Sequence, residues 1–391
     1  MAYLFVVLLL IFSAGSAAAV DEDARWKHYR DLQKYDPAGM IEKARLDIAK
    51  ARAAADEHAE LDALLRLSLG YATVDETSQQ EENERRGEEL AIKLGDTSAQ
   101  CWYVDGRAWV MWGQGKWTEA GALWDEAAAM ATRLGLKRVL ASIYTNRGQA
   151  HQVAERRAEA LQWLSKGYHL YEEINDNDGM ARALLYIGAV YGGPMAPAHD
   201  QLRASEHLER GLALVDMKRD RRLAVDFVLR MALTLTRRNE IAKARPWFTQ
   251  ALSLTRQLRL PHLEAIAEFH VGVAEMADKR PQEALAHLYR ARAIFQTVKD
   301  PSFQPRVLVT LGLLLAQQGR REEALAILAE AQPALAAVGT AENEAYYLPR
   351  AAEAHAALGN YAEAYRLVQG ARDAERRRTE AQNSQLAEEL R

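Results

Sequence analysis

Two short segments have the residue types of ligand-binding loops, but their spacing is wrong for that chemistry. Residues 113–116 (GQGK) could end a phosphate-binding loop, yet Trp117 stands where Ser or Thr must follow, and the upstream glycine is missing. Residues 175–179 (NDNDG) could form part of a calcium loop. With its glycine aligned, however, the first and last ligands would be Ile174 and Leu185, whose side chains offer no oxygen. We therefore expect both segments to be turns.

The other reactive residue types form no catalytic or metal-binding pattern. The ten histidines include no H-E-x-x-H motif and no paired spacing with cysteine, and no G-x-S-x-G nucleophile elbow occurs. Cys101 is the only cysteine, so no intrachain disulfide can form, and we expect it to be a small buried helix residue. These observations predict a non-catalytic protein without a cofactor or metal ion.

Small residues recur about every forty positions, which indicates the elements that carry the side chains. We call the recurring position the small slot; it holds Gly or Ala at positions 108, 148, 188, 232, 272, 312 and 352. Successive small slots are forty residues apart, except for one interval of forty-four. Alanine follows twelve residues later at positions 120, 160, 244, 284, 324 and 364. A large slot follows sixteen residues after the small one, or twenty in the repeat with the longer interval, at Trp124, Leu164, Leu208, Phe248, Leu288, Leu328 and Val368. A fixed period of this length is typical of a solenoid, which usually binds rather than catalyses.

Each repeat is predicted to be a pair of amphipathic helices. In residues 305–338, apolar residues follow helical spacing on both sides of a turn at Gly319. Gly115, Gly359 and Asn239 hold the same place in other repeats, and Gly and Asn tolerate the left-handed conformation that ends a helix. Glycine inside a helix costs about 1 kcal/mol relative to alanine. Close contact between the two helices must therefore offset that cost at the small slot.

The order of small, alanine, large and small residues resembles the tetratricopeptide repeat, and Tyr144 matches its early aromatic residue. The resemblance covers residues 61–375 in seven clear repeats and a weaker one at Ser68. Arg107 and Arg147 depart from it, because the family usually has leucine there, and the family's terminal proline is absent. The repeat is longer than the commonest family repeat of about thirty-four residues and is similar to those of bacterial regulators and sensors. The resemblance implies an all-α, right-handed superhelical solenoid.

The resemblance also implies where a ligand would lie, because the first helices of successive repeats line the concave face in this family. By register, the groove positions are six and two residues before the small slot, which share one helix face. Arginine there suits a carboxylate-bearing partner, since its planar fork bonds carboxylates bidentately. The alternative is a solvated face whose arginines pair with acidic neighbours such as Asp226. The expected groove residues are Trp102, Asn146, Arg182, Tyr186, Arg230, His270, Arg306 and Arg350.

Two local features interrupt the regular repeat. The interval of forty-four places its extra residues in 191–200, where two glycines and two prolines predict an exposed loop, either a tolerated insertion or a binding loop. Four tryptophans cluster in one repeat, at positions 102, 109, 112 and 117. We favour core packing for them, and the alternative is an aromatic contact patch.

An export signal is predicted at the N-terminus. Residues 4–12 (LFVVLLLIF) are an unbroken apolar run that is too short to span a bilayer, and Ala17-Ala18-Ala19 provides a cleavage site before Val20. Met1 to Tyr3 carry no Lys or Arg, which departs from the signal pattern. We expect removal of residues 1–19, a helical cap over residues 20–60, and a periplasmic or secreted protein. The alternative is an uncleaved membrane anchor.

Residues 376–391 are predicted to continue as a charged helix, because no glycine, proline or cap ends it. An export signal followed by long repeats and such a helix resembles the sensor halves of bacterial membrane signalling proteins. In those proteins a transmembrane helix and a diguanylate cyclase (GGDEF) or histidine kinase domain follow. A solubilising terminal helix is the alternative.

The protein is expected to be an exported scaffold that binds a protein or peptide on its concave face, and an anionic partner is among the candidates. It would act as the sensory or interaction part of a signalling system. The alternatives are a free-standing scaffold for cell-envelope assembly and an N-terminal fragment of a membrane sensor. The net charge of −4 lacks the excess of Lys and Arg that nucleic-acid binding requires. Membrane contact is expected only through the signal segment or a missing C-terminal region.

Overall fold

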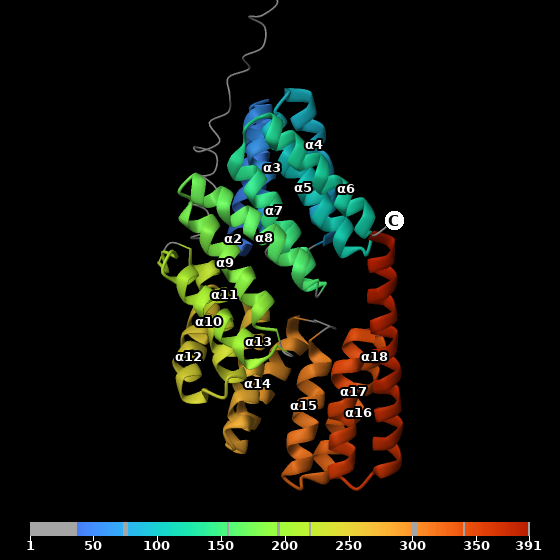
Figure 1. The fold of residues 1–391 in the computed structure, drawn as a ribbon. Coiled ribbons are helices and arrows are strands. Elements are labelled where there is room, and N and C mark those ends of the chain that lie inside the picture. The colour runs from blue at the N-terminus through green and yellow to red at the C-terminus, as the bar shows by residue number, and fades with distance from the viewer. Residues whose placement is uncertain are drawn as a thin grey trace, which may run out of the picture. The chain divides into compact units, whose positions relative to one another are not determined.

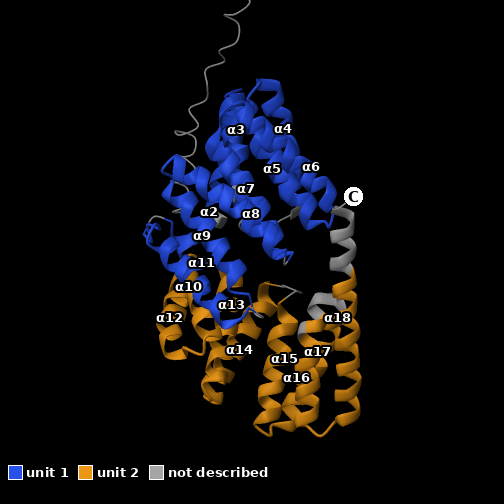
Figure 2. Ribbon diagram, viewed as in Figure 1, with its two compact units in different colours: residues 1–230 blue, residues 231–391 orange. Residues whose placement is uncertain are grey.

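The computed structural model describes residues 37–72, 77–154, 156–193, 196–218, 220–298, 303–338 and 341–389, and every regular element in these ranges is an α-helix (Figure 1). The predicted signal and residues 20–36 of the predicted cap lie outside the described residues. The chain divides into unit 1, Met1–Arg230, and unit 2, Met231–Arg391 (Figure 2). In the described ranges, no helix is both long and apolar enough to cross a membrane.

Unit 1 is built from helix pairs in which odd-numbered first helices alternate with even-numbered second helices. From α2 to α10 consecutive helices pack together, and the first helices α3, α5, α7 and α9 also contact one another in order. The helix α3 runs across residue 60, the expected end of the cap. The helices are α2 (Pro37–Ala53), α3 (Glu57–Ala72), α4 (Thr77–Leu94), α5 (Thr97–Gly113), α6 (Trp117–Arg133), α7 (Lys137–Val153), α8 (Arg157–Glu173), α9 (Asn177–Tyr191), α10 (Ala198–Leu212) and the start of α11 (Arg221–Arg237).

Unit 2 repeats the same alternation, with the first helices α13, α15 and α17 in contact in order. Its last helix runs without interruption through residue 376, so the predicted charged segment extends the final repeat helix. The helices are α12 (Ile241–Gln257), α13 (Pro261–Ala277), α14 (Pro281–Val298), α15 (Gln304–Gln317), α16 (Arg321–Val338), α17 (Ala341–Ala357) and α18 (Tyr361–Glu389).

The predicted helix ends are confirmed by backbone geometry. Gly115, Gly319 and Gly359 have φ angles of 77°, 72° and 75°, and Asn239 has 61°. These values fall in the left-handed region, which costs an ordinary L-residue energy but glycine little. The chain therefore reverses between paired helices where the sequence places these residues.

The small and large slots interlock as predicted. A methyl group added to Gly148 would lie 2.6 Å from Cγ of Leu164, and one added to Gly312 would lie 2.8 Å from Cδ2 of Leu328. Both distances are far below a van der Waals contact. Glycine is thus favoured over alanine at these two positions, because the two helices of one repeat approach so closely there.

Two arginines that depart from the repeat pattern are accommodated by ion pairs. The guanidinium of Arg107 lies 2.6 Å from a carboxylate oxygen of Glu88, and that of Arg147 lies 2.6 Å from Asp125. Arg147 also stacks 4.1 Å from the ring centroid of Trp163. Polar pairing and ring contact replace the packing that leucine would give at these positions.

The irregular repeat has a shorter loop than the sequence predicts. Tyr191 is the last residue of α9, and 198–200 form the first turn of α10, so the connection is confined to 192–197; residues 194 and 195 lie outside the described ones. Asp200 is 2% exposed and accepts a hydrogen bond of 2.7 Å from Arg157. The expectation of an exposed loop over all of 191–200 was therefore wrong at Asp200, because that carboxylate pairs with α8.

The clustered tryptophans and Cys101 mostly pack in or against the hydrophobic core. Cys101 and Trp124 are buried, and Trp102, Trp109 and Trp112 pack partly buried against the core that α5, α6 and α7 share. Trp109 and Trp112 stack with ring centroids 5.4 Å apart. Trp117 differs, because 45% of its surface is exposed at the start of α6.

Candidate functional site

The groove residues expected in unit 1 lie on successive first helices. Trp102 is on α5, Asn146 on α7, Arg182 and Tyr186 on α9, and Arg230 on α11. All five are partly buried, whereas Ala108, Gly148 and Gly188 at the small slots are buried. The register thus separates a packing position from positions that solvent still reaches.

A polar cluster on α9 and α11 brings three of these residues together. We define the central cluster as Arg182, Tyr186, Arg222, Asp226 and Arg230. Nη1 of Arg222 lies 2.6 Å from Oδ2 of Asp226, and Tyr186 interacts electrostatically with all three arginines. The sequence analysis missed Arg222, which lies eight residues before Arg230 and, by register, one turn from Asp226 on the same helix.

The charges of the central cluster compensate one another. Burial alone would lower the pKa of Arg182, but Tyr186, Asp220, Tyr171 and Asp226 together raise it. Burial raises the pKa of Tyr186, and the positive charge of Arg182 opposes this shift. The guanidiniums of Arg182 and Arg222 therefore interact with the carboxylates of Asp220 and Asp226, and Asp178 adds a further negative charge close to Asp220.

Such a balanced cluster presents hydrogen-bond donors and acceptors side by side. Guanidiniums can donate to a peptide carbonyl, and carboxylates can accept from a peptide N–H. The cluster therefore matches the alternating groups of a peptide main chain better than it matches a multiply charged anion.

Asn146 is tied to a buried carboxylate that the sequence analysis did not single out. Its Nδ2 donates to Oδ2 of Asp105 at 2.6 Å, and Nε1 of Trp124 donates to Oδ1 at 2.9 Å. Burial raises the pKa of Asp105 to about 6, although both hydrogen bonds favour the ionised form. The hydrogen bond to Asp105 on α5 therefore fixes the orientation of the Asn146 side chain.

A second buried acid lies next to Asp105. Glu84 is 2% exposed, and burial raises the pKa of its carboxyl group to about 8, against hydrogen bonds with Ser68 and Gln80. It occupies the large slot, sixteen residues after Ser68, where the other repeats have apolar residues. Alignment of the weak repeat on this slot would have revealed it.

The groove residues expected in unit 2 form a separate set. Nε of Arg306 on α15 donates to Oη of Tyr347 at 2.9 Å, and its guanidinium lies 4.9 Å from the ring centroid of Phe303. His270 on α13 contacts the same phenylalanine, with 6.2 Å between ring centroids. Arg350 lies partly buried on α17. Phe303 thus joins two of the three expected residues.

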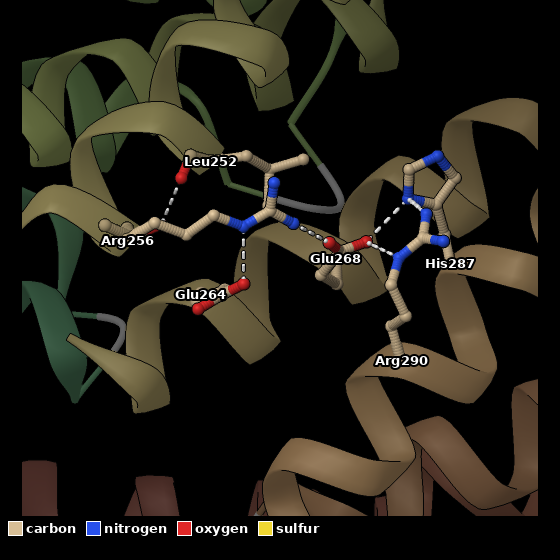
Figure 3. Close-up of polar contacts among 7 residues, drawn as sticks. Leu252, Arg256, Glu264, Glu268, His287 and Arg290 are labelled. Atoms are coloured by element: carbon tan, nitrogen blue, oxygen red, sulfur yellow. Dashed lines mark hydrogen bonds and ion pairs between the residues drawn. The ribbon is translucent and has the colours of Figure 1, made fainter. Parts of the chain in front are cut away.

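Unit 2 also contains a buried ion cluster around Glu268 (Figure 3). This carboxylate accepts from Arg256 on α12 at 2.7 Å and from Arg290 on α14 at 3.1 Å, and it lies 2.6 Å from Nδ1 of His287. Burial would raise the pKa of Glu268, but His287 and Arg290 hold it below its ordinary value. The equivalent position in other repeats is apolar, at Leu184, Val228 and Leu308. In this repeat an ion cluster therefore joins α12, α13 and α14 at a position where other repeats have an apolar side chain.

Potential metal ligands do not cluster in the described part of the chain. No group of three or more His, Cys, Asp or Glu side chains there is arranged to hold a metal ion. The clusters above combine acids with arginines, which pair with the carboxylates that a cation would need.

Paired helices, interlocking slots and partly exposed first-helix positions define a helical repeat protein of the solenoid class. Residues 263–337, from α13 to α16, match the family model of the tetratricopeptide repeat. This match agrees with the resemblance that the residue lattice predicts for these residues, and the described helices have the fold of a helical repeat solenoid. No curated protein matches the chain.

Several solved structures have the same fold. A Rap protein complexed with competence and sporulation factor is 15% identical, with a TM-score of 0.54 over 82% of this chain and 99% of that chain. The apo form of the quorum sensor NprR from B. thuringiensis is 14% identical, with a TM-score of 0.58 over 86% and 98%. Aspartyl phosphate phosphatase F from Bacillus subtilis is 12% identical, with a TM-score of 0.57 over 93% and 94%. At such identities these likenesses show the fold alone.

Proposed function

We propose that this chain is an exported, non-catalytic scaffold that binds a protein or peptide through the face formed by its first helices. The central cluster carries this proposal, because it places paired donors and acceptors on partly exposed positions of α9 and α11. Solenoids with such a face are generally binding proteins. A peptide segment with few charges suits the balanced cluster best, and an anionic partner is the second candidate because the face carries Arg182, Arg222 and Arg230.

Two neighbours by fold were solved with a bound partner, and one of these partners is a peptide. The Rap protein is complexed with competence and sporulation factor, and a Rap conjugation gene regulator of a plasmid is complexed with the Phr* peptide. A third neighbour is named as a phosphatase, but we assign this chain no reaction because its sequence contains no recognised nucleophile and base.

A variant of the central cluster tests this proposal. We would replace Arg182 and Arg230 with alanine and measure capture of partners from an envelope extract by quantitative mass spectrometry. Partners of the native chain should be depleted at least tenfold, since each arginine contributes charge-assisted hydrogen bonds. The matched control is Arg133→Ala, which alters an exposed arginine on the second helix α6. Equal capture by the native and double-variant chains, both folded, would remove the central cluster as the binding face.

We further propose that the protein acts in the periplasm or outside the cell, as the sensory or interaction part of a signalling system. This rests on the apolar run 4–12 and the cleavage pattern at Ala17–Ala19, together with the charged helix α18. N-terminal sequencing of the purified protein should begin at Val20. An N-terminus at Met1 or Ala2 in a cytoplasmic fraction would refute export and leave the binding proposal intact.

A further inference from the structure

A cavity of about 300 Å³ lies between α2, α3 and α4 in unit 1. Its walls combine apolar side chains, among them Ile48, Leu64 and Leu67, with the guanidinium-bearing Arg45 and Arg86. Small-molecule sites typically combine apolar walls with a few polar groups, and the volume of this cavity lies at the lower end of their usual range.

The cavity lies on the opposite side of α3 from the groove positions. By register from Ser68, the groove positions of α3 are Asp62 and Arg66, six and two residues before the small slot. The cavity side of the same helix contributes Leu64, Leu67 and Tyr71. At about 100° per residue, these two sets point in nearly opposite directions. The cavity is therefore separate from the face proposed to bind a partner.

The polar wall of the cavity is fixed by hydrogen bonds. Nη2 of Arg45 donates to Oε1 of Gln79 at 2.8 Å and to Oη of Tyr71 at 3.1 Å. Nε of Arg52 and Nη2 of Arg86 both donate to the same oxygen, Oε1 of Glu60, at 2.8 and 2.9 Å. Both arginines line the cavity, and one carboxylate is shared between them.

Arginine is the main charged residue type among the described residues that line the cavity. Three arginines, at positions 45, 52 and 86, line it together with one carboxylate, that of Glu82, and Glu60 pairs with Arg52 and Arg86. Each guanidinium has five N–H donors, and an apolar wall strengthens its attraction for an anion by excluding water. A ligand with one negative charge and an apolar body would complement this arrangement.

We propose that this cavity binds an apolar carboxylate, either a free organic acid or the C-terminal residue of a peptide. The carboxylate lies against Arg45 and Arg86, and the apolar body packs on Ile48, Leu64 and Leu67. Arginine suits this task because its planar fork bonds carboxylates bidentately. This site goes beyond the proposed function and does not depend on it.

Calorimetric titration of the full chain tests the proposal with two acids and one uncharged analogue. N-acetyl-leucine represents a peptide end, hexanoate a free acid, and N-acetyl-leucinamide lacks the charge. We expect at least one acid to bind, and at least tenfold tighter than the amide. If hexanoate binds and N-acetyl-leucine does not, the source is a free acid; the reverse result indicates a peptide end. Equal binding of acid and amide, or no binding of either acid, overturns the proposal.

Two neighbouring arginines provide a matched pair of variants. Arg86 lines the cavity, whereas Arg85 lies outside it in an exposed ion pair with Glu89. Arg86→Ala should weaken acid binding about tenfold or more, and Arg85→Ala should leave it unchanged. Equal loss in both variants would point to a general charge effect and overturn the site.

Further variants guard against misfolding and a wrong location. Arg86→Lys keeps the charge beside Glu60 but lacks the planar fork, so it should fold and still bind less tightly than the native chain. The double variant of Arg182 and Arg230 should bind the acid normally. If it loses acid binding while Arg86→Ala retains it, the acid binds in the groove and this assignment is wrong.

Discussion

Replacement of Glu84 by glutamine should stabilise the protein, and increasingly so as pH rises. The carboxyl group is buried beside Ser68, Gln80 and Gly106, and it forms no ion pair with a described residue. In the native state its pKa is raised from 4.5 to about 8. Glutamine has the same shape and can both donate and accept hydrogen bonds, so it preserves the contacts while removing the ionisation.

The direction of the pH effect follows from proton linkage. Between pH 4.5 and about 8 the folded chain keeps a proton on Glu84 that the unfolded chain has released. The free energy of unfolding therefore falls as pH rises through this range. At about 1.4 kcal/mol per pKa unit, the loss accumulates to about 5 kcal/mol by pH 9. The glutamine variant should differ from the native chain by less than about 1 kcal/mol at pH 5 and by several kcal/mol at pH 9.

Urea unfolding followed by tryptophan fluorescence measures this difference where it arises. Five of the eight tryptophans lie between residues 102 and 124, in the helices that contact Glu84 or follow it. The control is Glu89→Gln, because Glu89 is exposed and pairs with Arg85 on the surface. Parallel pH profiles for the native and Glu84→Gln chains, or a stability gain that does not grow from pH 5 to pH 9, would refute the reasoning.

Three further substitutions probe the skeleton, each followed by thermal or urea unfolding. Gly148→Ala should destabilise the protein by about 1–3 kcal/mol, because its methyl group would lie 2.6 Å from Leu164. Gly121→Ala, whose methyl group would meet nothing nearby, should stabilise the protein by up to about 1 kcal/mol. The same sign for both variants would contradict the interlock of small and large slots. Glu268→Gln should cost about 3 kcal/mol near neutral pH by leaving Arg256, His287 and Arg290 without their buried carboxylate. Because the pKa of Glu268 is lowered, this deficit should shrink as pH falls below 4.5, and a deficit independent of pH would argue against the ion cluster. Lys279→Gly should stabilise by about 0.5–1 kcal/mol, since Lys279 has a φ of 59°, and a loss of stability would show that its side chain matters more than its backbone.

The fold was predictable because repetition multiplies weak signals. A single Gly148 or Ala160 carries little information, but the same spacing in seven repeats identifies the helix pair, the turn and the contact between them. The left-handed turns at Gly115 and Asn239 and the contact of Gly148 with Leu164 follow from local geometry, which each repeat reproduces. The tetratricopeptide match to residues 263–337 agrees with this inference.

The candidate site was predictable only as a set of positions. Register placed Arg182, Tyr186 and Arg230 on partly exposed first-helix surfaces, but it could not show that Arg222 pairs with Asp226 beside them or that Asp220 and Asp226 compensate the charge of Arg182. The alternative of arginines paired with acidic neighbours therefore describes the Arg222–Asp226 pair. Whether a charged side chain attracts a ligand depends on the charges that neighbouring helices bring within a few ångströms.

The sequence by itself determined where helices begin, end and approach one another, because small residues, turns and apolar spacing act within one repeat. Only the tertiary structure decided the electrostatic state of the polar side chains. Glu84, Asp105 and Glu268 are all acids in buried positions, yet the first two have raised pKa values and the third a lowered one. The difference arises because an adjacent helix supplies Glu268 with His287 and Arg290, whereas the hydrogen-bond partners of Glu84 and Asp105 are uncharged. Burial and charge pairing act through space, and a linear pattern does not record them.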